Sequence, residues 1–169
     1  PFVKELGNPI AKRILFDREK SIKRFCKTID NFNKTNKDVD IYIENNVFSL
    51  SNFNNYGENP LLFTHYDDLQ ELYKYASFPI ILDVAHLKVS CNTLKIDFEN
   101  NFSRLVNISD YLHLSDNDAR EDSNLEINKN SNIINILKNV NLKNKIITLE
   151  VYQEIDKIKS TYKIIEKLI

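Results

Sequence analysis

The sequence lacks the marks of several protein classes. Cys26 and Cys91 are the only cysteines, and their separation fits no zinc-ligand or redox spacing. We therefore expect two reduced, buried thiols, as is usual inside a cell. No apolar run approaches the roughly 20 residues that cross a bilayer, and no charged-then-apolar leader opens the chain. These absences predict a cytoplasmic protein that does not contact a membrane.

The chain also lacks an excess of charge of either sign. Its formal net charge of -1 provides no general attraction to nucleic acid or anionic lipid. Hydrophobic residues make up 42% and charged residues 28% of the 169 residues, as in an ordinary globular protein. This length corresponds to one domain with a core of its own. We expect a single domain over residues 1–169.

Apolar periodicity predicts an alternation of helices and strands. The expected strands lie near residues 39–44, 80–83, 111–113 and 145–150. The expected helices lie near residues 18–36, after Thr64 or Asp67, within 87–107, and near 131–139 and 153–168. Polar loops of about 20 and about 16 residues follow the first and third strands.

This alternation of apolar strands and helices predicts an α/β fold with a parallel sheet. The strand ends recur at intervals of about 30 to 40 residues, close to the unit of a (β/α)₈ barrel. The predicted fold is therefore of the parallel TIM-barrel type, with about four strand-helix units in this chain.

Each predicted strand ends on a side chain of a type that binds metal ions. These residues are Glu44, Asp83, His113 and Glu150. Burying such a charge unpaired is costly, and packing alone does not explain four of them at one period. Carboxylates with one imidazole suit Mn²⁺, Mg²⁺, Co²⁺ or Zn²⁺. One acid alone is more often a helix cap or an ion-pair partner, so the prediction of a metal site depends on all four residues together.

Two further polar groups follow these strands. His86 comes three residues after Asp83 and can lean over the same site. Asp116, Asn117 and Asp118 follow His113 and can contact a substrate or support the ligands, although the acids can equally cap a turn. His65 groups with no other candidate residue.

These segments resemble, in order, those of the xylose-isomerase-like TIM-barrel superfamily. They read IYIENN at 41–46, ILDVAH at 81–86, LHLSDND at 112–118 and IITLEV at 146–151. The superfamily includes sugar isomerases and epimerases as well as zinc-dependent apurinic-site endonucleases. The resemblance implies that the chain is the C-terminal half of a barrel, with strands five to eight. It would then be a fragment of a longer protein, which we favour and which would associate with the missing half, or a half-barrel that pairs with another copy.

The resemblance also implies an activity and residue roles. Glu44, Asp83, His113 and Glu150 would hold a divalent metal ion. Glu44 and Glu150 would also be catalytic and move the proton next to a carbonyl of a sugar or sugar phosphate. His86, Asp116 and Arg120 would bind this substrate, although the position of Arg120 relative to His113 leaves its assignment open. This makes a metal-dependent isomerase or epimerase of carbohydrate metabolism the leading hypothesis.

Two alternatives stay open. A zinc-dependent endonuclease or phosphodiesterase would need an Asp-x-His pair, but the corresponding stretch reads Asp122-Ser123-Asn124. The glycines that usually follow are replaced by Asn128 and Asn130, and the net charge also argues against a nucleic-acid partner. The other alternative is a non-catalytic barrel that binds a sugar-like ligand or a partner protein.

Overall fold

The computed structural model describes residues 3–5, 8–9 and 17–169 of the chain. A short antiparallel pair consists of β1 (Val3–Glu5) and β2 (Asn8–Pro9). The main sheet consists of β3 (Ile43–Glu44), β4 (Ile80–Asp83), β5 (Tyr111–Leu114) and β6 (Ile146–Leu149). Its strands are all parallel and lie side by side in chain order. The predicted α/β fold with a parallel sheet is confirmed.

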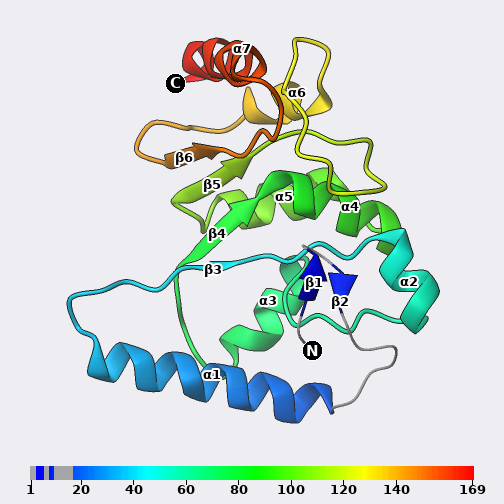
Figure 1. The fold of residues 1–169 in the computed structure, drawn as a ribbon. Coiled ribbons are helices and arrows are strands. Elements are labelled where there is room, and N and C mark those ends of the chain that lie inside the picture. The colour runs from blue at the N-terminus through cyan, green and yellow to red at the C-terminus, as the bar shows by residue number, and fades with distance from the viewer. Residues whose placement is uncertain (1–2, 6–7, 10–16) are drawn as a thin grey trace.

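Helices connect these strands and follow the last one. They are α1 (Arg18–Thr35), α2 (Leu50–Tyr56), α3 (Tyr66–Tyr73), α4 (Val84–Leu94), α5 (Phe98–Val106), α6 (Asn132–Leu137) and α7 (Ile155–Ile165), which continues as the 3₁₀ helix η1 (Glu166–Leu168). Figure 1 shows the sheet between α1 at one end and α7 at the other. Among the described helices, none is both long and apolar enough to span a membrane.

Local chemistry explains where several helices begin. The side chains of Asp17, Asp83, Asp97 and Ser131 each accept a hydrogen bond from a backbone N–H in the first turn of the helix that follows. Such caps satisfy N–H groups that have no partner within the helix. Asp83 is therefore both the last residue of β4 and the cap of α4, so the chain passes from strand to helix without a loop.

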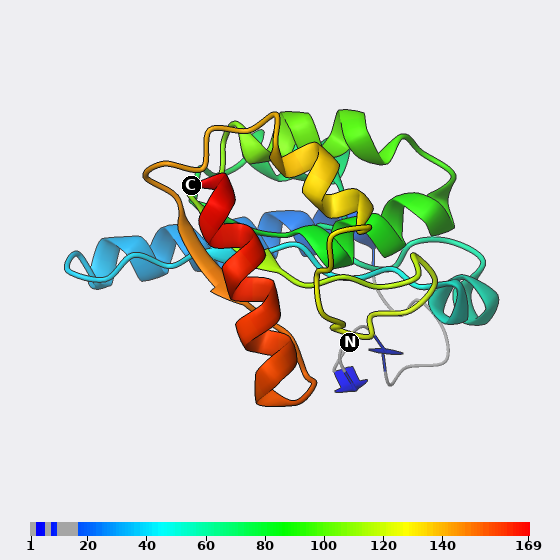
Figure 2. The ribbon, with the colours of Figure 1, turned by 90° about the horizontal axis from the view of Figure 1, so that it is seen from above.

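The two faces of the sheet have different surroundings. Ile80, Leu82, Leu112 and Leu114 are fully buried in one core with residues of α4, α5 and α6, which lie on the same side of the sheet (Figure 2). The alternate residues point to the other face, because side chains of a strand alternate. There Tyr111 and Thr148 are half-buried, and Ile146 is 54% exposed. The second face is therefore much more open than the first.

Two elements differ from the sequence-based expectation. The polar loop expected after the first strand contains α2, which is capped by Ser49 and ends at Gly57 with φ of 73°. The first strand is also shorter than predicted, because only Ile43 and Glu44 pair with β4. Val39, at the expected start of that strand, is exposed and has no neighbouring strand in the described structure.

Candidate metal centre

The four strand-end residues meet at one point. Glu44, Asp83, His113 and Glu150 each offer a ligand atom, and these four atoms lie within 4.8 Å of one another. The outer strands of a four-stranded sheet are about 14 Å apart, so the side chains from β3 and β6 must lean toward the middle. Register contributes to this convergence, because Asp83 lies directly beside His113 on neighbouring strands. Glu150 follows β6, and its N–H donates to the carbonyl oxygen of Leu114 at 3.0 Å.

Three of the four converging side chains have an atom without a hydrogen-bond partner in the part of the chain that the structure describes. Asp83 Oδ2, His113 Nδ1 and Glu150 Oε2 are buried and unpartnered among the described residues. His113 Nδ1 lies 3.1 Å from Glu150 Oε2 and 3.6 Å from Glu44 Oε1, without the direction of a hydrogen bond. Buried polar atoms are almost always satisfied in native proteins, and a bound ion can supply the partner that such an atom lacks. The donor set therefore fits a divalent ion.

Hydrogen bonds to backbone groups hold Asp83 in place. Asp83 is 0% exposed, and its Oδ1 accepts a 2.7 Å hydrogen bond from the His86 N–H. The buried side chain of Asn45 forms two hydrogen bonds with the backbone of Asp83. Asn45 Nδ2 donates to the Asp83 carbonyl oxygen at 2.9 Å, and Asn45 Oδ1 accepts from the Asp83 N–H at 2.8 Å. Asn45 thus joins the ends of β3 and β4, which brings Glu44 beside Asp83.

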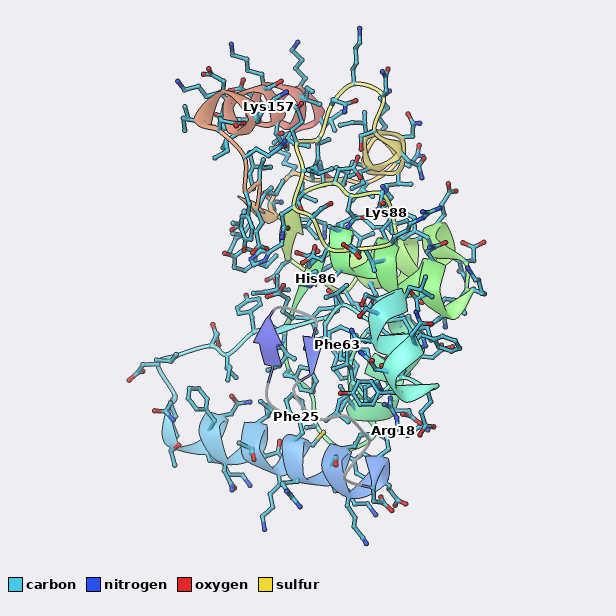
Figure 3. The ribbon with its side chains drawn as sticks, turned by 45° about the vertical axis from the view of Figure 1, so that its right-hand side comes forward. Arg18, Phe25, Phe63, His86, Lys88 and Lys157 are labelled. Atoms are coloured by element: carbon cyan, nitrogen blue, oxygen red, sulfur yellow. The ribbon has the colours of Figure 1, made fainter. Side chains whose placement is uncertain are left out.

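His86 lies next to this cluster, near the middle of the molecule (Figure 3). Its Nδ1 lies 2.9 Å from the Asn45 carbonyl oxygen and 3.3 Å from Glu44 Oε1. Its Nε2 lies 3.1 Å from Asp122 Oδ2. The structure therefore brings His86 to the predicted site but turns both ring nitrogens toward acceptors of the protein itself.

Electrostatics at the centre favour the protonated forms of Asp83 and His113. Burial raises the pKa of the Asp83 carboxyl above its ordinary value, although the neighbouring His86 opposes this shift. Glu44 raises the pKa of His113, against the effect of burial. Burial disfavours charge on His86, but the carboxylates of Asp83 and Asp122 raise its pKa. Asp83 and His113 consequently hold protons that a bound cation would displace.

The other predicted substrate-binding residues lie in the loop after β5. Asp116 Oδ1 accepts from Lys88 Nζ at 2.6 Å, and Asp116 Oδ2 accepts a short hydrogen bond from the hydroxyl of Ser131. Asp116 therefore holds its loop against α4 and α6. Arg120 is exposed, and its backbone N–H donates to Asp118 Oδ1 at 2.9 Å. Neither Asp116 nor Arg120 belongs to the cluster of four ligands.

The same loop brings Asp122 back toward the centre. The backbone groups of Asp116 and Leu125 exchange hydrogen bonds of 2.9 and 2.8 Å, which close the loop between them. Asp122 Oδ1 is buried and unpartnered among the described residues. Asn124, where an endonuclease-type site would carry histidine, lies with its Nδ2 3.5 Å from Asp122 Oδ2 and accepts from the Ser115 hydroxyl at 2.9 Å.

Sequence reasoning overlooked two residues at this site, Asn45 and Tyr152. Asn45 directly follows a ligand, but its role depends on a neighbouring strand. Tyr152 lies two residues after Glu150, and its hydroxyl donates to Glu150 Oε1 at 2.6 Å. This hydrogen bond is the main cause that raises the pKa of Tyr152 to about 12. Alternation along an extended segment places residues i and i+2 on one side, and this signal could have indicated Tyr152.

Comparisons with family models, curated proteins and solved structures found no match to this chain. The geometry of the site is therefore the basis for any functional assignment.

Proposed function

We propose that this chain carries a divalent-metal centre and acts as a metal-dependent isomerase or epimerase of a sugar or sugar derivative. The observation that carries the proposal is the convergence of Glu44, Asp83, His113 and Glu150. Three of them, Asp83, His113 and Glu150, each have a buried side-chain atom without a hydrogen-bond partner among the described residues. A cluster of this kind destabilises the metal-free chain, since each unpaired buried polar atom costs about 1–3 kcal/mol. Such a cost is understandable where a cation compensates for it.

The arrangement of the carboxylates supports proton transfer as the reaction. A bound divalent ion would polarise the oxygens of a carbonyl substrate and acidify the neighbouring C–H. Glu44 and Glu150 come from the two outer strands of the sheet, so they reach the centre from opposite sides. One carboxylate can then remove the proton, and the other can return it. Asp83 and His113, between them, hold the centre in place.

We further propose that the sheet is part of a TIM-type barrel. Its parallel strands follow one another in chain order, and the ligands lie at the carboxyl ends of the strands, where barrel enzymes have their sites. In the described structure β6 pairs only with β5, so its outer edge is open. The barrel would be completed by the missing half or by another copy, and light scattering of the purified chain distinguishes association from a monomer.

The test of the proposed activity is exchange of a carbon-bound proton with solvent. The chain, loaded with Mn²⁺ or Co²⁺, is incubated in D₂O with a panel of aldoses, ketoses and their phosphates. Loss of the C–H signal next to the carbonyl is followed by NMR after removal of the metal. We expect exchange for at least one sugar, and at least a 100-fold loss in Glu150→Gln, on the order of what one well-placed acid-base group contributes.

Glu166→Gln is the matched control for this experiment. Glu166 is an exposed glutamate of the same C-terminal segment and does not belong to the ligand cluster. Exchange that continues unchanged in Glu150→Gln would rule out the proposed role of Glu150. No exchange across the whole panel, in a chain that binds the ion, would favour a non-catalytic site.

A further inference from the structure

Tyr152 lies at the rim of the metal centre and contacts one of its ligands. Its backbone N–H donates to the Asn124 carbonyl oxygen at 3.0 Å, which ties the segment after β6 to the loop after β5. Its hydroxyl donates to Glu150 Oε1 at 2.6 Å. The residue as a whole is 68% exposed. Packing therefore does not explain the position of the Tyr152 side chain. The main contact described for this side chain is the hydrogen bond from its hydroxyl to Glu150.

This hydrogen bond makes the two oxygens of Glu150 different. Oε1 is occupied by the Tyr152 hydroxyl, whereas Oε2 is buried, unpartnered and 3.1 Å from His113 Nδ1. A phenol keeps its proton at neutral pH and acts as a donor. Its contact with Oε1 opposes rotation of the carboxylate and also occupies the oxygen that a second coordination bond would need.

We propose that Tyr152 is a positioning residue of the metal centre, which holds Glu150 so that Oε2 alone is directed at the ion. The inference rests on the metal centre proposed above and goes beyond its four ligands. Groups that orient a ligand from outside typically contribute 10–100-fold to metal affinity. Without the phenol, Glu150 becomes free to bind through both oxygens or to turn toward solvent.

The chain contains a matched control in Tyr162. The hydroxyl of Tyr162 also donates to a glutamate, Glu166 Oε1, at 3.1 Å, and the residue is 56% exposed. That pair lies on α7 and η1, and neither residue belongs to the cluster of four side chains. Tyr152→Phe and Tyr162→Phe therefore remove the same group from the same kind of contact, and only the first touches the centre.

The experiment is a titration of both variants and the unaltered chain with Co²⁺ alone. Visible absorption reports the geometry around Co²⁺, which a merely structural role of Tyr152 would leave unchanged. We expect Tyr152→Phe to bind Co²⁺ about 10-fold more weakly and with altered band positions and intensities. Tyr162→Phe should match the unaltered chain in both respects. Far-UV circular dichroism checks that each variant is folded.

Three results would overturn the inference. Tyr152→Phe could match the unaltered chain in affinity and spectrum, which would remove Tyr152 from the centre and leave the centre itself intact. Both variants could change equally, which would indicate a general effect of losing a tyrosine hydroxyl. Failure of the unaltered, folded chain to bind Co²⁺ would instead overturn the metal centre and, with it, the role of Tyr152.

Discussion

The region around Asp68 and the centre around Asp83 both place a buried carboxylate beside a histidine. At Asp68 every oxygen is paired, because Arg18 Nη2 donates to Oδ1 at 2.5 Å, and the Thr64 N–H and hydroxyl donate to Oδ2 at 2.9 and 2.6 Å. His65 Nδ1 also lies 2.9 Å from Oδ2. At Asp83, one carboxylate oxygen has no partner among the described residues. Figure 3 shows Arg18 and His86 in separate parts of the molecule.

This difference shows which feature indicates a site. Acids and histidines often gather in proteins, and a set such as Asp68, His65 and Arg18 is explained by the joining of α1 to α3. Because both carboxylate oxygens of Asp68 already have partners, neither is free to bind a metal ion. Around Asp83, by contrast, side chains converge from four strand ends. Asp83, His113 and Glu150 each keep a buried atom without a hydrogen-bond partner among the described residues. Buried atoms without a hydrogen-bond partner, rather than the residue types, therefore mark the candidate metal centre.

The largest expected difference between the two regions is in metal affinity. Asp83→Asn should weaken Mn²⁺ binding by more than about 100-fold, since a lost ligand costs more than a lost supporting contact. Asparagine keeps the cap of α4, so the fold is retained. Asp68→Asn should bind Mn²⁺ like the unaltered chain. Isothermal titration calorimetry measures the Mn²⁺ affinity of both variants. Equal affinities would contradict the distinction between the centre around Asp83 and the region around Asp68.

The free energy of unfolding should show the opposite order, with the larger loss in Asp68→Asn. Asp68→Asn leaves Arg18 and His65 without their carboxylate and should lower the free energy of unfolding by about 2 kcal/mol. Asp83→Asn, studied with a chelator, should be as stable as the unaltered chain or more stable, because it removes a carboxylate whose charge is disfavoured mainly by burial. Urea denaturation checks both expectations. A larger loss in Asp83→Asn than in Asp68→Asn would mean that Asp83 mainly supports the fold.

Metal binding should strengthen as the pH rises. The pKa of Asp83 is raised by burial, and that of His113 is raised by Glu44, so both groups hold protons to higher pH than usual. Each displaced proton increases the apparent affinity by up to about tenfold per pH unit while its group is protonated. Affinity should therefore increase from about pH 6 to 8. Calorimetry in buffers of different ionisation enthalpy would detect the released protons, and a flat profile without proton release would contradict this.

Asp68 should instead affect stability in acid. Burial alone would raise its pKa, but hydrogen bonds from His65 and Thr64 and the charges of His65 and Arg18 bring the pKa below its ordinary value. A lowered pKa in the folded state adds stability above the unfolded value of about 3.9, and this is lost as the pH falls through the folded pKa. The stability difference between the unaltered chain and Asp68→Asn should therefore shrink below about pH 4. A difference that persists there would disprove this linkage.

The smallest expected effect is that of Arg18→Lys. Arg18 joins three acceptors at once: Asp68, the carbonyl oxygen of Leu61 and Glu71. Lysine keeps the charge but lacks the planar fork, so stability should fall by about 1 kcal/mol. Metal affinity should not change. A change in metal affinity in this variant would show that the two regions are coupled.

The sheet and the convergence of the four strand-end residues could be predicted from the sequence, because both follow from local patterns. Apolar strands alternating with helices indicate a parallel sheet, and the carboxyl ends of its strands meet at one edge. The contacts of Asp116 and Asn45 could not be predicted, since they depend on Lys88, Ser131 and Asp83 on other elements. Helix α2 was missed because its Asn-rich sequence resembles a loop, while the Ser49 cap and Gly57 set its ends.

The most direct test of the central claim is to locate a bound ion. Crystals of the unaltered chain grown or soaked with Mn²⁺ give anomalous diffraction that marks the metal position. We expect one strong peak within coordination distance, about 2.0–2.6 Å, of oxygens from Glu44, Asp83 and Glu150 and a nitrogen of His113. A chain with no peak at these residues, or with Mn²⁺ bound only to exposed carboxylates elsewhere, would contradict the proposed metal centre.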